Sequence, residues 1–401
     1  MKKVVKGIIV VLVLFLINPA GLFAWSSEES SSKMDTHKLI AEQAVTILQN
    51  DIDGNESTEF VDNLQILYDN IDKLKEGAVW PDFDPDGYSL YQEHFYDPDT
   101  GLNFTNGNIG ETAETQTRLF VAIALHEWKN GNYSTAAFEL GTAMHYFADA
   151  NEPHHASNQI AGVGYAHSSF ESWMEDVKYE YAIDTAGVTT TDDFYTGALT
   201  SETYLSDFLA SSTYDTASAA KDVVNFAQHS SSWDDWEFAG EQCMTNAQVN
   251  MAQLFYRFLQ EVSNDYTKST PDAIGKFHVV IKVADTYEAG TDDYVYFGMK
   301  LNDGRKLEFE CDVEGNDFSQ GLRWGYEFEI NDETFTAADI TKVWIKKKDY
   351  TWLGDDLKIK YIQIYMKGKN VLDETINDWI GKGGAWGSKV YYKISVDGFT
   401  Y

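Results

Sequence analysis

This 401-residue sequence is poor in cysteine and in basic residues, and it has one long apolar run, at its start. Cys243 and Cys311 are its two cysteines, and because they fall in different predicted domains, we expect two free thiols and no disulfide framework. Lys and Arg number 30 against 64 Asp and Glu, which gives a formal net charge of -34. Nucleic acids and anionic headgroups are normally bound by clustered Lys and Arg. We therefore expect no nucleic-acid partner.

The apolar run has the features of a signal peptide. Three lysines precede the apolar residues 7–17, and Ala24 offers a small residue for cleavage. The run is too short for a comfortable transmembrane helix, and no later segment approaches the roughly 20 apolar residues that such a helix needs. We therefore predict that residues 1–24 are a signal peptide, that the protein is secreted and extracellular, and that Trp25 begins the mature chain.

The spacing of apolar residues divides the remaining chain into two domains. Apolar residues recur every three or four positions, as on helices, in 36–50, 60–75, 118–129, 135–150, 170–182 and 246–262. Apolar and polar residues alternate, as in strands, in 276–283, 294–300, 306–311, 326–330, 342–347, 359–366 and 389–396. The polar stretch 264–275 between them predicts a linker. We expect an all-α domain at 25–263 and an all-β antiparallel β-sandwich at 276–401.

Two histidine–carboxylate pairs have the spacing of metal ligands on helices. His145 and Asp149 are four residues apart, as are His167 and Glu171, so each pair projects from one helix face. One such pair is often an ordinary surface contact, but two pairs with the doublet His154–His155 between them favour a metal site. Imidazole and carboxylate without thiolate are typical of hydrolytic zinc sites. These residues alone leave open which histidine of the doublet is the ligand.

Further candidate ligands lie upstream of these pairs. They are Asp82 and His94 in a loop-rich stretch, and His37 on the first predicted helix. The α-amino group of Trp25 is another candidate, because its pKa of about 7.7 to 8 lets a metal displace its proton near neutral pH. Taken singly, each of these residues has an ordinary packing or surface role as an alternative.

Together these motifs resemble those of the bacterial zinc-dependent phospholipases C, and within them the clostridial alpha-toxin branch. The resemblance extends over essentially the whole mature chain and includes Trp80-Pro81-Asp82, Gln92-Glu93-His94-Phe95 and Met144-His145-Tyr146-Phe147-Ala148-Asp149. It implies three zinc ions per chain, with these ligands: Trp25 and His37 for one ion; Asp82, His94 and His145 for a second; Asp149 bridging the two; and His155, His167 and Glu171 for the third. The spacing of the family's ligands selects His155 over His154.

The resemblance also implies a reaction. A metal-activated hydroxide would attack phosphorus in phosphatidylcholine, and diacylglycerol and phosphocholine would be released. Asp82 is the implied catalytic residue, acting as general base. Phe83 and Tyr91 are the implied headgroup-binding residues, whose rings would hold the quaternary ammonium; the alternative is that both rings simply pack. Sphingomyelin is a second candidate substrate, and haemolysin or toxin activity is a candidate role.

The carboxy-terminal domain resembles a PLAT-type (lipoxygenase-homology) sandwich, which implies calcium-assisted membrane binding with two to three calcium ions per chain. Its turns are rich in the oxygen ligands that calcium prefers, although Gly, Asn and Asp are also common in ordinary turns. The implied calcium ligands are Glu288, Gly290, Thr291, Asp292, Asp293, Asp312, Gly315, Asn316, Asp317, Asp355 and Asp356. The implied membrane-contact residues are Tyr350, Trp352 and Leu353.

Two other functions fit parts of the sequence. One is a different zinc phosphodiesterase, because single-strand nucleases of the trinuclear-zinc fold also use an amino-terminal Trp; the acidic charge and the sandwich argue against it. The other is a non-catalytic lipid-binding protein in which zinc is structural. No protein partner is implied, and we expect a monomer that acts on choline phospholipid in membranes.

Overall fold

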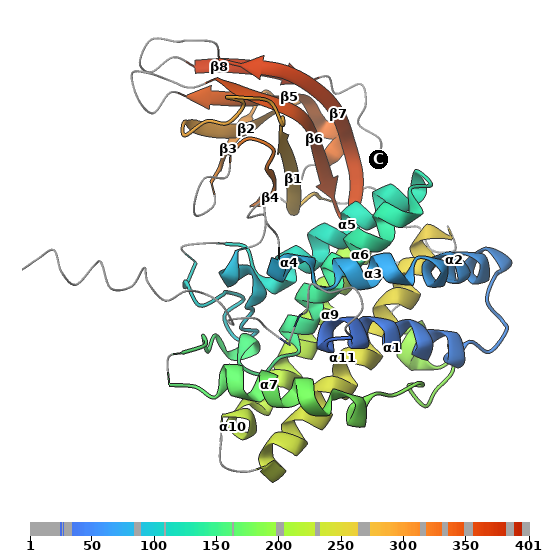
Figure 1. The fold of residues 1–401 in the computed structure, drawn as a ribbon. Coiled ribbons are helices and arrows are strands. Elements are labelled where there is room, and N and C mark those ends of the chain that lie inside the picture. The colour runs from blue at the N-terminus through green and yellow to red at the C-terminus, as the bar shows by residue number, and fades with distance from the viewer. Residues whose placement is uncertain are drawn as a thin grey trace, which may run out of the picture.

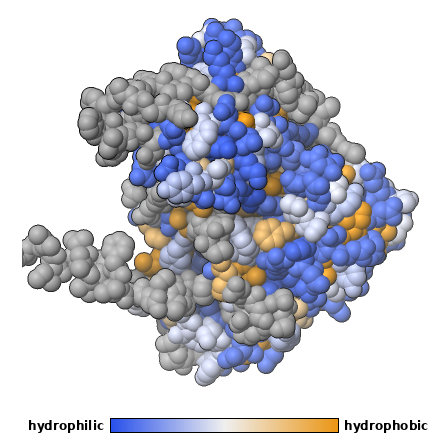
Figure 2. All heavy atoms as spheres, turned by 45° about the horizontal axis from the view of Figure 1, so that its top comes forward, coloured by the Kyte–Doolittle hydropathy of each residue, from blue (hydrophilic) through white to orange (hydrophobic). Residues whose placement is uncertain are grey.

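The computed structural model describes residues 25, 27, 34–83, 90–107, 110–162, 164–197, 204–228, 233–263, 273–312, 318–330, 336–348, 356–381 and 389–394 (Figure 1). The predicted signal peptide and residues 264–272 of the predicted linker lie outside them. Within these ranges, no helix has both the length and the hydrophobicity that a membrane span requires. Hydrophilic residues predominate on the face of the molecule in Figure 2, as the charged composition leads one to expect.

The first part of the chain is helical, and its helices surround one hydrophobic core (Figure 1). The helices are α1 (Thr36–Asp51), α2 (Thr58–Asp69), α3 (Ile71–Gly77), α4 (Trp80–Phe83), α5 (Ala113–Lys129), α6 (Tyr133–Ala150), α7 (His167–Val177), α8 (Asp193–Thr196), α9 (Leu205–Asp222), α10 (Val224–Ala227) and α11 (Trp233–Val262). Short 3-10 helices, Tyr91–His94, His155–Ser157 and Lys178–Tyr181, lie between them.

The predicted helices are all present, but several have different bounds. The predicted helix 60–75 is two helices, because Asn70 ends α2 and its side-chain amide donates to the carbonyl of Ile66 over 2.8 Å. The predicted helix 246–262 is the second half of the 30-residue α11. Helix α9 was not predicted at all. After Leu209, the residues that it buries are Thr and Ala, which give little apolar periodicity.

The second part of the chain forms two four-stranded antiparallel sheets around a separate core. The strands are β1 (Lys276–Val283), β2 (Tyr294–Leu301), β3 (Lys306–Cys311), β4 (Arg323–Glu329), β5 (Ile340–Lys348), β6 (Leu357–Met366), β7 (Lys369–Ile380) and β8 (Lys389–Ile394). Their order is β4-β1-β6-β7 in one sheet and β3-β2-β5-β8 in the other. The predicted antiparallel sandwich is confirmed, with the addition of the unpredicted strand β7.

One sheet of the sandwich packs against α5 of the helical part (Figure 1). Two arginines cross this contact, of which Arg118 is buried and Arg323 is partly buried. Arg118 on α5 pairs with Glu327 on β4, and Arg323 on β4 donates to Glu139 on α6 over 2.7 Å. Each guanidinium therefore meets a carboxylate from the opposite part, and both charges are paired where access to water is reduced. The contact therefore sets the position of the sandwich relative to α6.

A pair of glycines brings α3 and α6 into backbone contact. A Cβ atom built on Gly141 of α6 would lie 2.0 Å from the carbonyl oxygen of Leu74, and one on Gly77 of α3 would lie 2.0 Å from that of Phe138. No side chain fits at either position, so both helices need glycine there. The close approach places the end of α3 beside the part of α6 that carries His145.

Candidate metal centre

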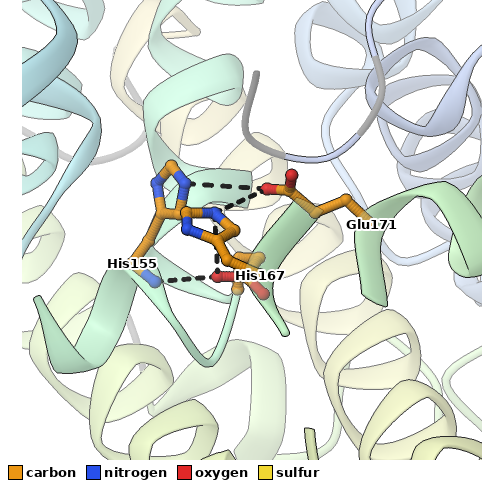
Figure 3. A group of neighbouring side chains, drawn as sticks. His155, His167 and Glu171 are labelled. Atoms are coloured by element: carbon orange, nitrogen blue, oxygen red, sulfur yellow. Dashed lines mark hydrogen bonds and ion pairs between the residues drawn. The ribbon is translucent and has the colours of Figure 1, made fainter. Parts of the chain in front are cut away.

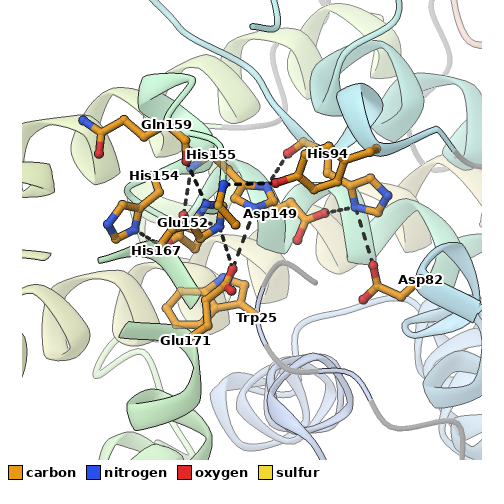
Figure 4. A network of polar contacts seen from close by, with 12 residues as sticks. Trp25, Asp82, His94, Asp149, Glu152, His154, His155, Gln159, His167 and Glu171 are labelled. Atoms are coloured by element: carbon orange, nitrogen blue, oxygen red, sulfur yellow. Dashed lines mark hydrogen bonds and ion pairs between the residues drawn. The ribbon is translucent and has the colours of Figure 1, made fainter. Parts of the chain in front are cut away.

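The nine predicted zinc ligands all belong to the described residues, and the structure brings them together from distant parts of the chain. Figure 4 labels all of them except His37 and His145. The side chain of Asp82 is 4 % exposed, and the other eight residues are 5 % exposed or less. Burying so many imidazoles and carboxylates is costly unless they are paired or coordinate metal. We therefore expect a charged partner, such as a metal ion, among these buried polar groups, because the apolar core around them offers none.

Helix α6 provides the middle of the cluster. His145 and Asp149 lie one turn apart on α6, and both are fully buried. The Nδ1–H of His145 donates to the carbonyl oxygen of Ala78 over 2.9 Å, and its Nε2 lies 3.3 Å from Asp149 Oδ2. Because a carbonyl can only accept, this bond fixes the tautomer. The lone pair of Nε2 then faces the cluster, as in histidines that bind metal.

One group of candidate ligands joins α1 to α6. His37 Nε2 lies 3.1 Å from Asp149 Oδ1, and the rings of His37 and His145 stack with centroids 4.1 Å apart. Trp25 is fully buried and donates its indole N–H to the carbonyl oxygen of Ala148 over 2.8 Å, one residue before Asp149. The side chain of Trp25 is therefore held beside the residue that precedes Asp149.

A second group lies on the other side of Asp149. His94 Nδ1 is 2.7 Å from Asp149 Oδ2 and 3.1 Å from His145 Nε2. Asp82, on the short helix α4, places Oδ1 3.9 Å from His94 Nδ1 and 3.7 Å from His145 Nε2. Each oxygen of Asp149 thus faces a different group, which is the arrangement that a bridging carboxylate requires. Asp82 itself comes from the segment that follows α3.

The third group is shown in Figure 3 and contains one residue that sequence reasoning missed. His167 Nε2 is 2.9 Å from Glu171 Oε1, and His155 Nε2 is 3.7 Å from the same oxygen. Glu152 Oε2 lies 4.0 Å from His167 Nε2. The four ligand atoms of this group all lie within 4.8 Å of one another. The only sequence signal for Glu152 was its position in the turn that leads to His155.

Backbone carbonyls also orient the histidines of the third group. The Nδ1–H of His155 donates to the carbonyl oxygen of His94, and that of His167 donates to Gln159, both over 2.7 Å. His155 Nε2 is buried without a hydrogen-bond partner, as is Oδ2 of Asp82. Buried polar atoms are rarely left unpaired. Lone pairs directed inward from oriented imidazoles and carboxylates fit zinc, whose hydrolytic sites use this ligand set.

The charges of the cluster also fit a metal. Among the residues that the structure describes, no Lys or Arg pairs with Asp82, Asp149, Glu152 or Glu171. Burial raises the pKa of Glu171 to about 8. Burial also lowers the pKa of His155 to about 3, so this imidazole is neutral, which is the form that binds metal. Burial acts in the same direction on His145 and His167, but neighbouring carboxylates outweigh it and raise their pKa values to about 9. Bound divalent cations would replace the positive charge of these imidazolium groups.

Contacts around Asp149 and Glu152 keep both carboxylates ionised. Burial acts to raise the pKa of Asp149, but the contacts with His145, His37 and His94 outweigh it and hold the pKa well below its usual range. Burial opposes ionisation of Glu152 in the same way, yet His154 beside it lowers the pKa to about 2. Both carboxylates are therefore in the ionised form that binds metal.

The two residues predicted to hold the headgroup lie near the second group. Phe83 ends α4, next to Asp82. Tyr91 packs edge-on against Phe95 with ring centroids 5.1 Å apart, and its hydroxyl accepts a hydrogen bond from the backbone N–H of Ala161 over 3.3 Å. The ring of Tyr91 thus packs against neighbouring residues, as the alternative interpretation held, while its position leaves the choline-binding role untested.

The predicted calcium ligands that the structure describes converge at one end of the sandwich. The backbone N–H of Thr291 donates to the carbonyl oxygen of Phe318, and Ala289 accepts from Lys358. These bonds hold the turn at 288–293 beside the chain that follows residue 317 and beside Asp356, at the start of β6. The described candidates are Glu288, Gly290, Thr291, Asp292, Asp293, Asp312 and Asp356.

Two of these acidic residues have opposite surroundings. Asp292 is exposed to solvent. Asp293 is buried, and its carboxylate forms an ion pair with the buried ammonium of Lys347 on β5. Gly315, Asn316, Asp317 and Asp355, and the predicted membrane contacts Tyr350, Trp352 and Leu353, lie outside the described residues. Neither cysteine forms a disulfide, as predicted, and both are buried.

Comparison with known proteins identifies close relatives. The family described as zinc dependent phospholipase C matches residues 36–221, and the PLAT/LH2 domain matches residues 277–390. Phospholipase C of Clostridium perfringens is 40% identical over 387 residues, covering 94% of this chain and 96% of the relative, and that of Paraclostridium bifermentans is 37% identical over 384 residues, covering 94% and 96%. The alpha toxin structure from Clostridium absonum superposes with a TM-score of 0.85 at 37% identity, covering 92% of this chain and 100% of that chain.

Proposed function

The chain belongs to the zinc-dependent phospholipase C family, and from this premise we propose that it hydrolyses phosphatidylcholine to diacylglycerol and phosphocholine at the buried cluster. That it is a phospholipase C with a PLAT domain follows from relatives that match nearly its whole length. The observation that carries the more specific proposal is the set of oriented imidazoles around Asp149, together with carboxylates that have no Lys or Arg partner among the described residues. We further propose that the protein is exported after removal of residues 1–24 and acts as a monomer.

The proposed zinc ligands follow the three groups of the cluster. Trp25 and His37 hold one ion, and Asp82, His94 and His145 hold a second. Asp149 contributes one carboxylate oxygen to each, a role supported by its contacts of 3.1 Å to His37 and 2.7 Å to His94. The third ion is held by His155, His167 and Glu171. Bound zinc supplies a lowered pKa for water and positive charge for the oxygens of a phosphodiester.

Asp82 is the proposed general base. Its Oδ1 faces His94 and His145, while its buried Oδ2 has no hydrogen-bond partner. One oxygen is thus available to accept a proton while the other stays with the metal ligands. Phe83 and Tyr91 lie close by in the sequence and in the fold, and we propose that their rings face the quaternary ammonium of the substrate.

The sandwich has a separate role in this proposal. Calcium, bound by the turn at 288–293 together with Asp312, Asp356 and the neighbouring segments, would dock the sandwich on a phospholipid surface. Tyr350, Trp352 and Leu353 would enter its interfacial zone. The net charge of -34 disfavours direct contact with anionic lipid, and bound calcium would offset this repulsion locally. Sphingomyelin cleavage and haemolysis are extensions of the same proposal.

A lipid-release assay tests the proposed reaction. The mature chain starting at Trp25 should release phosphocholine from phosphatidylcholine micelles, a chelator should abolish the release, and added zinc should restore it. His145→Gly should lose activity by several orders of magnitude, because both neighbouring ions lose a ligand or its support. His126→Gly is the matched control, since His126 lies on α5 away from the cluster and pairs with Asp373. Turnover unchanged by chelator and by His145→Gly would refute the proposal.

A further inference from the structure

The third group of the metal centre contains a carboxylate for which the proposed function has no use. Glu152 is fully buried. Its carboxylate accepts a hydrogen bond from the Nδ1–H of His154 and another from the backbone N–H of His155, both over 2.7 Å. Among the described residues, no Lys or Arg contacts it. Each oxygen of the carboxylate accepts one hydrogen bond and keeps a further lone pair that can bind a cation, and a buried carboxylate without Lys or Arg favours such a cation.

The position of this carboxylate indicates what that cation is. Glu152 Oε2 lies 4.0 Å from His167 Nε2, and its ligand atom falls within 4.8 Å of those of His155, His167 and Glu171. Four ligands around tetrahedral zinc lie about 3.3 Å from one another, given bonds of about 2.0 to 2.1 Å. Contraction of the group by no more than about 1.5 Å per contact would bring all four into that arrangement.

We propose that Glu152 is a fourth protein ligand of the zinc ion held by His155, His167 and Glu171. This inference rests on the zinc assignment made above and adds a residue to it. Two imidazoles and two carboxylates would match the charge of one divalent ion and fill its tetrahedral shell. Such closed sites are structural, whereas catalytic sites keep one position open. The open position needed for catalysis is therefore left to the groups around Asp149.

His154, the other member of the histidine doublet, has a positioning role in this arrangement. Its Nδ1–H donates to Glu152 Oε1, and its ring stacks on that of His167 with centroids 5.0 Å apart and planes 2° apart. It therefore contacts two of the four ligands without directing a nitrogen at the ion. Carboxylates that bind metal are commonly held by such hydrogen bonds, and removing them weakens binding by about 10- to 100-fold.

Zinc binding by purified variants tests the proposal without relying on activity. The mature protein and Glu152→Gln are equilibrated in zinc buffers, and bound zinc is measured by elemental analysis. We expect three tight ions in the unaltered protein, and in the variant two tight ions and one whose affinity is at least about 100-fold weaker. His154→Phe should retain the ring stacking and weaken the same ion by about 10-fold. Asp176→Asn, at an exposed acidic residue of the same helix α7, is the matched control and should keep three tight ions.

A crystal structure of the zinc-loaded protein, phased at the zinc edge, separates a ligand from a merely structural turn residue. An oxygen of Glu152 at about 2.0 to 2.2 Å from the third ion would support the proposal, and a carboxylate more than about 3 Å away would overturn it. Three ions with unchanged affinities in Glu152→Gln would overturn it as well. If that variant fails to fold, Glu152→Asp, which keeps the charge but withdraws the carboxylate, should show the same selective weakening.

These outcomes distinguish the inference from the proposed function. If the unaltered protein binds no zinc, both the proposed function and the proposed role of Glu152 are refuted. Three ions and phosphocholine release in the unaltered protein, together with three equally tight ions in Glu152→Gln, would leave the proposed function standing and remove only the role of Glu152.

Discussion

His145 donates its Nδ1 proton to the carbonyl oxygen of Ala78 over 2.9 Å. Ala78 is the residue that directly follows α3, whereas His145 lies in the second half of α6. The direction of a proposed zinc ligand therefore depends on the contact between these two helices, which the glycine pair Gly77 and Gly141 makes possible. A change in the packing of α3 against α6 should therefore also change the orientation of His145 in the metal centre.

Gly141→Ala should disturb the metal centre from a position outside it. The added Cβ atom would lie 2.0 Å from the carbonyl oxygen of Leu74, which is backbone and cannot move aside without shifting α3. We expect a loss of about 1 to 3 kcal/mol in the free energy of unfolding, and weaker zinc binding because Ala78 moves with α3. Denaturant unfolding and zinc titration measure the two effects.

Gly110→Ala is the control for this substitution. A Cβ atom at Gly110 meets nothing within 4 Å, and its backbone does not need a positive φ. Stability should change by less than about 0.5 kcal/mol. Equal effects of the two substitutions would show that the contact between α3 and α6 has no special importance.

The amino terminus gives a second prediction. If the backbone of Trp25 binds zinc, one extra residue before Trp25 converts its amine into an amide, which is a poor ligand at neutral pH. We expect a Gly-extended protein to lose most of its phospholipase activity and to bind one zinc ion more weakly. Proteolytic removal of the added residue should restore both. Full activity with the extension in place would rule out the terminal amine as a ligand.

The helices and strands show what apolar periodicity can predict. Helix α1 and the antiparallel sandwich were predicted because their buried residues are large and regularly spaced. Helix α9 was missed because it buries Thr213, Thr216 and Ala217, whose small side chains do not stand out from a polar sequence. The break at Asn70 was missed because it depends on one side-chain hydrogen bond to Ile66.

The residues of the metal centre could likewise be predicted only in part. Spacing of four residues placed His145 with Asp149 and His167 with Glu171 on their helices, and the family resemblance supplied the ligands that are distant in sequence. Neither source pointed to Glu152, because a single glutamate in a turn has no periodicity. Its significance comes from burial and from the absence of a Lys or Arg partner among the described residues, and both of these depend on tertiary structure.

The calcium turn allows a prediction about two adjacent aspartates. Asp292 is exposed and is the proposed ligand of the pair. Asp293 already pairs with Lys347, whose side chain is 1 % exposed. We expect Asp292→Asn to weaken calcium-dependent binding to phosphatidylcholine vesicles without affecting stability. Asp293→Asn should instead destabilise the fold by about 3 to 5 kcal/mol, because it removes the carboxylate charge from a buried ion pair with Lys347.

Vesicle sedimentation at varied calcium concentration, combined with thermal unfolding of both variants, measures this contrast. Asp312→Asn, at a second exposed candidate ligand, should resemble Asp292→Asn. The assignment of roles would be reversed if Asp293→Asn kept full stability and lost calcium-dependent binding.

His278 makes the contact between the two parts of the protein sensitive to acid. It lies on β1, with Nε2 3.3 Å from Glu327 and a side chain that is 7 % exposed. Burial lowers its pKa from 6.5 to about 4, an effect that Glu327 opposes and that Arg118 and Lys276 reinforce. A lowered folded-state pKa means that the unfolded chain binds the proton more readily. The contribution of neutral His278 to the free energy of unfolding is therefore fully present above pH 6.5, and it is lost as the pH falls towards 4.

At pH 4.5 this linkage should cost roughly 2 to 3 kcal/mol relative to pH 7. His278→Gln removes the titrating group but keeps a polar, uncharged side chain, so its stability should fall less over the same interval. The measurement is the free energy of unfolding in urea at both pH values for the two proteins. Loss of zinc and protonation of carboxylates affect both proteins alike, so the difference between them isolates His278. If the two proteins lose the same amount, the imidazole must be as easily protonated in the folded contact as in the unfolded chain.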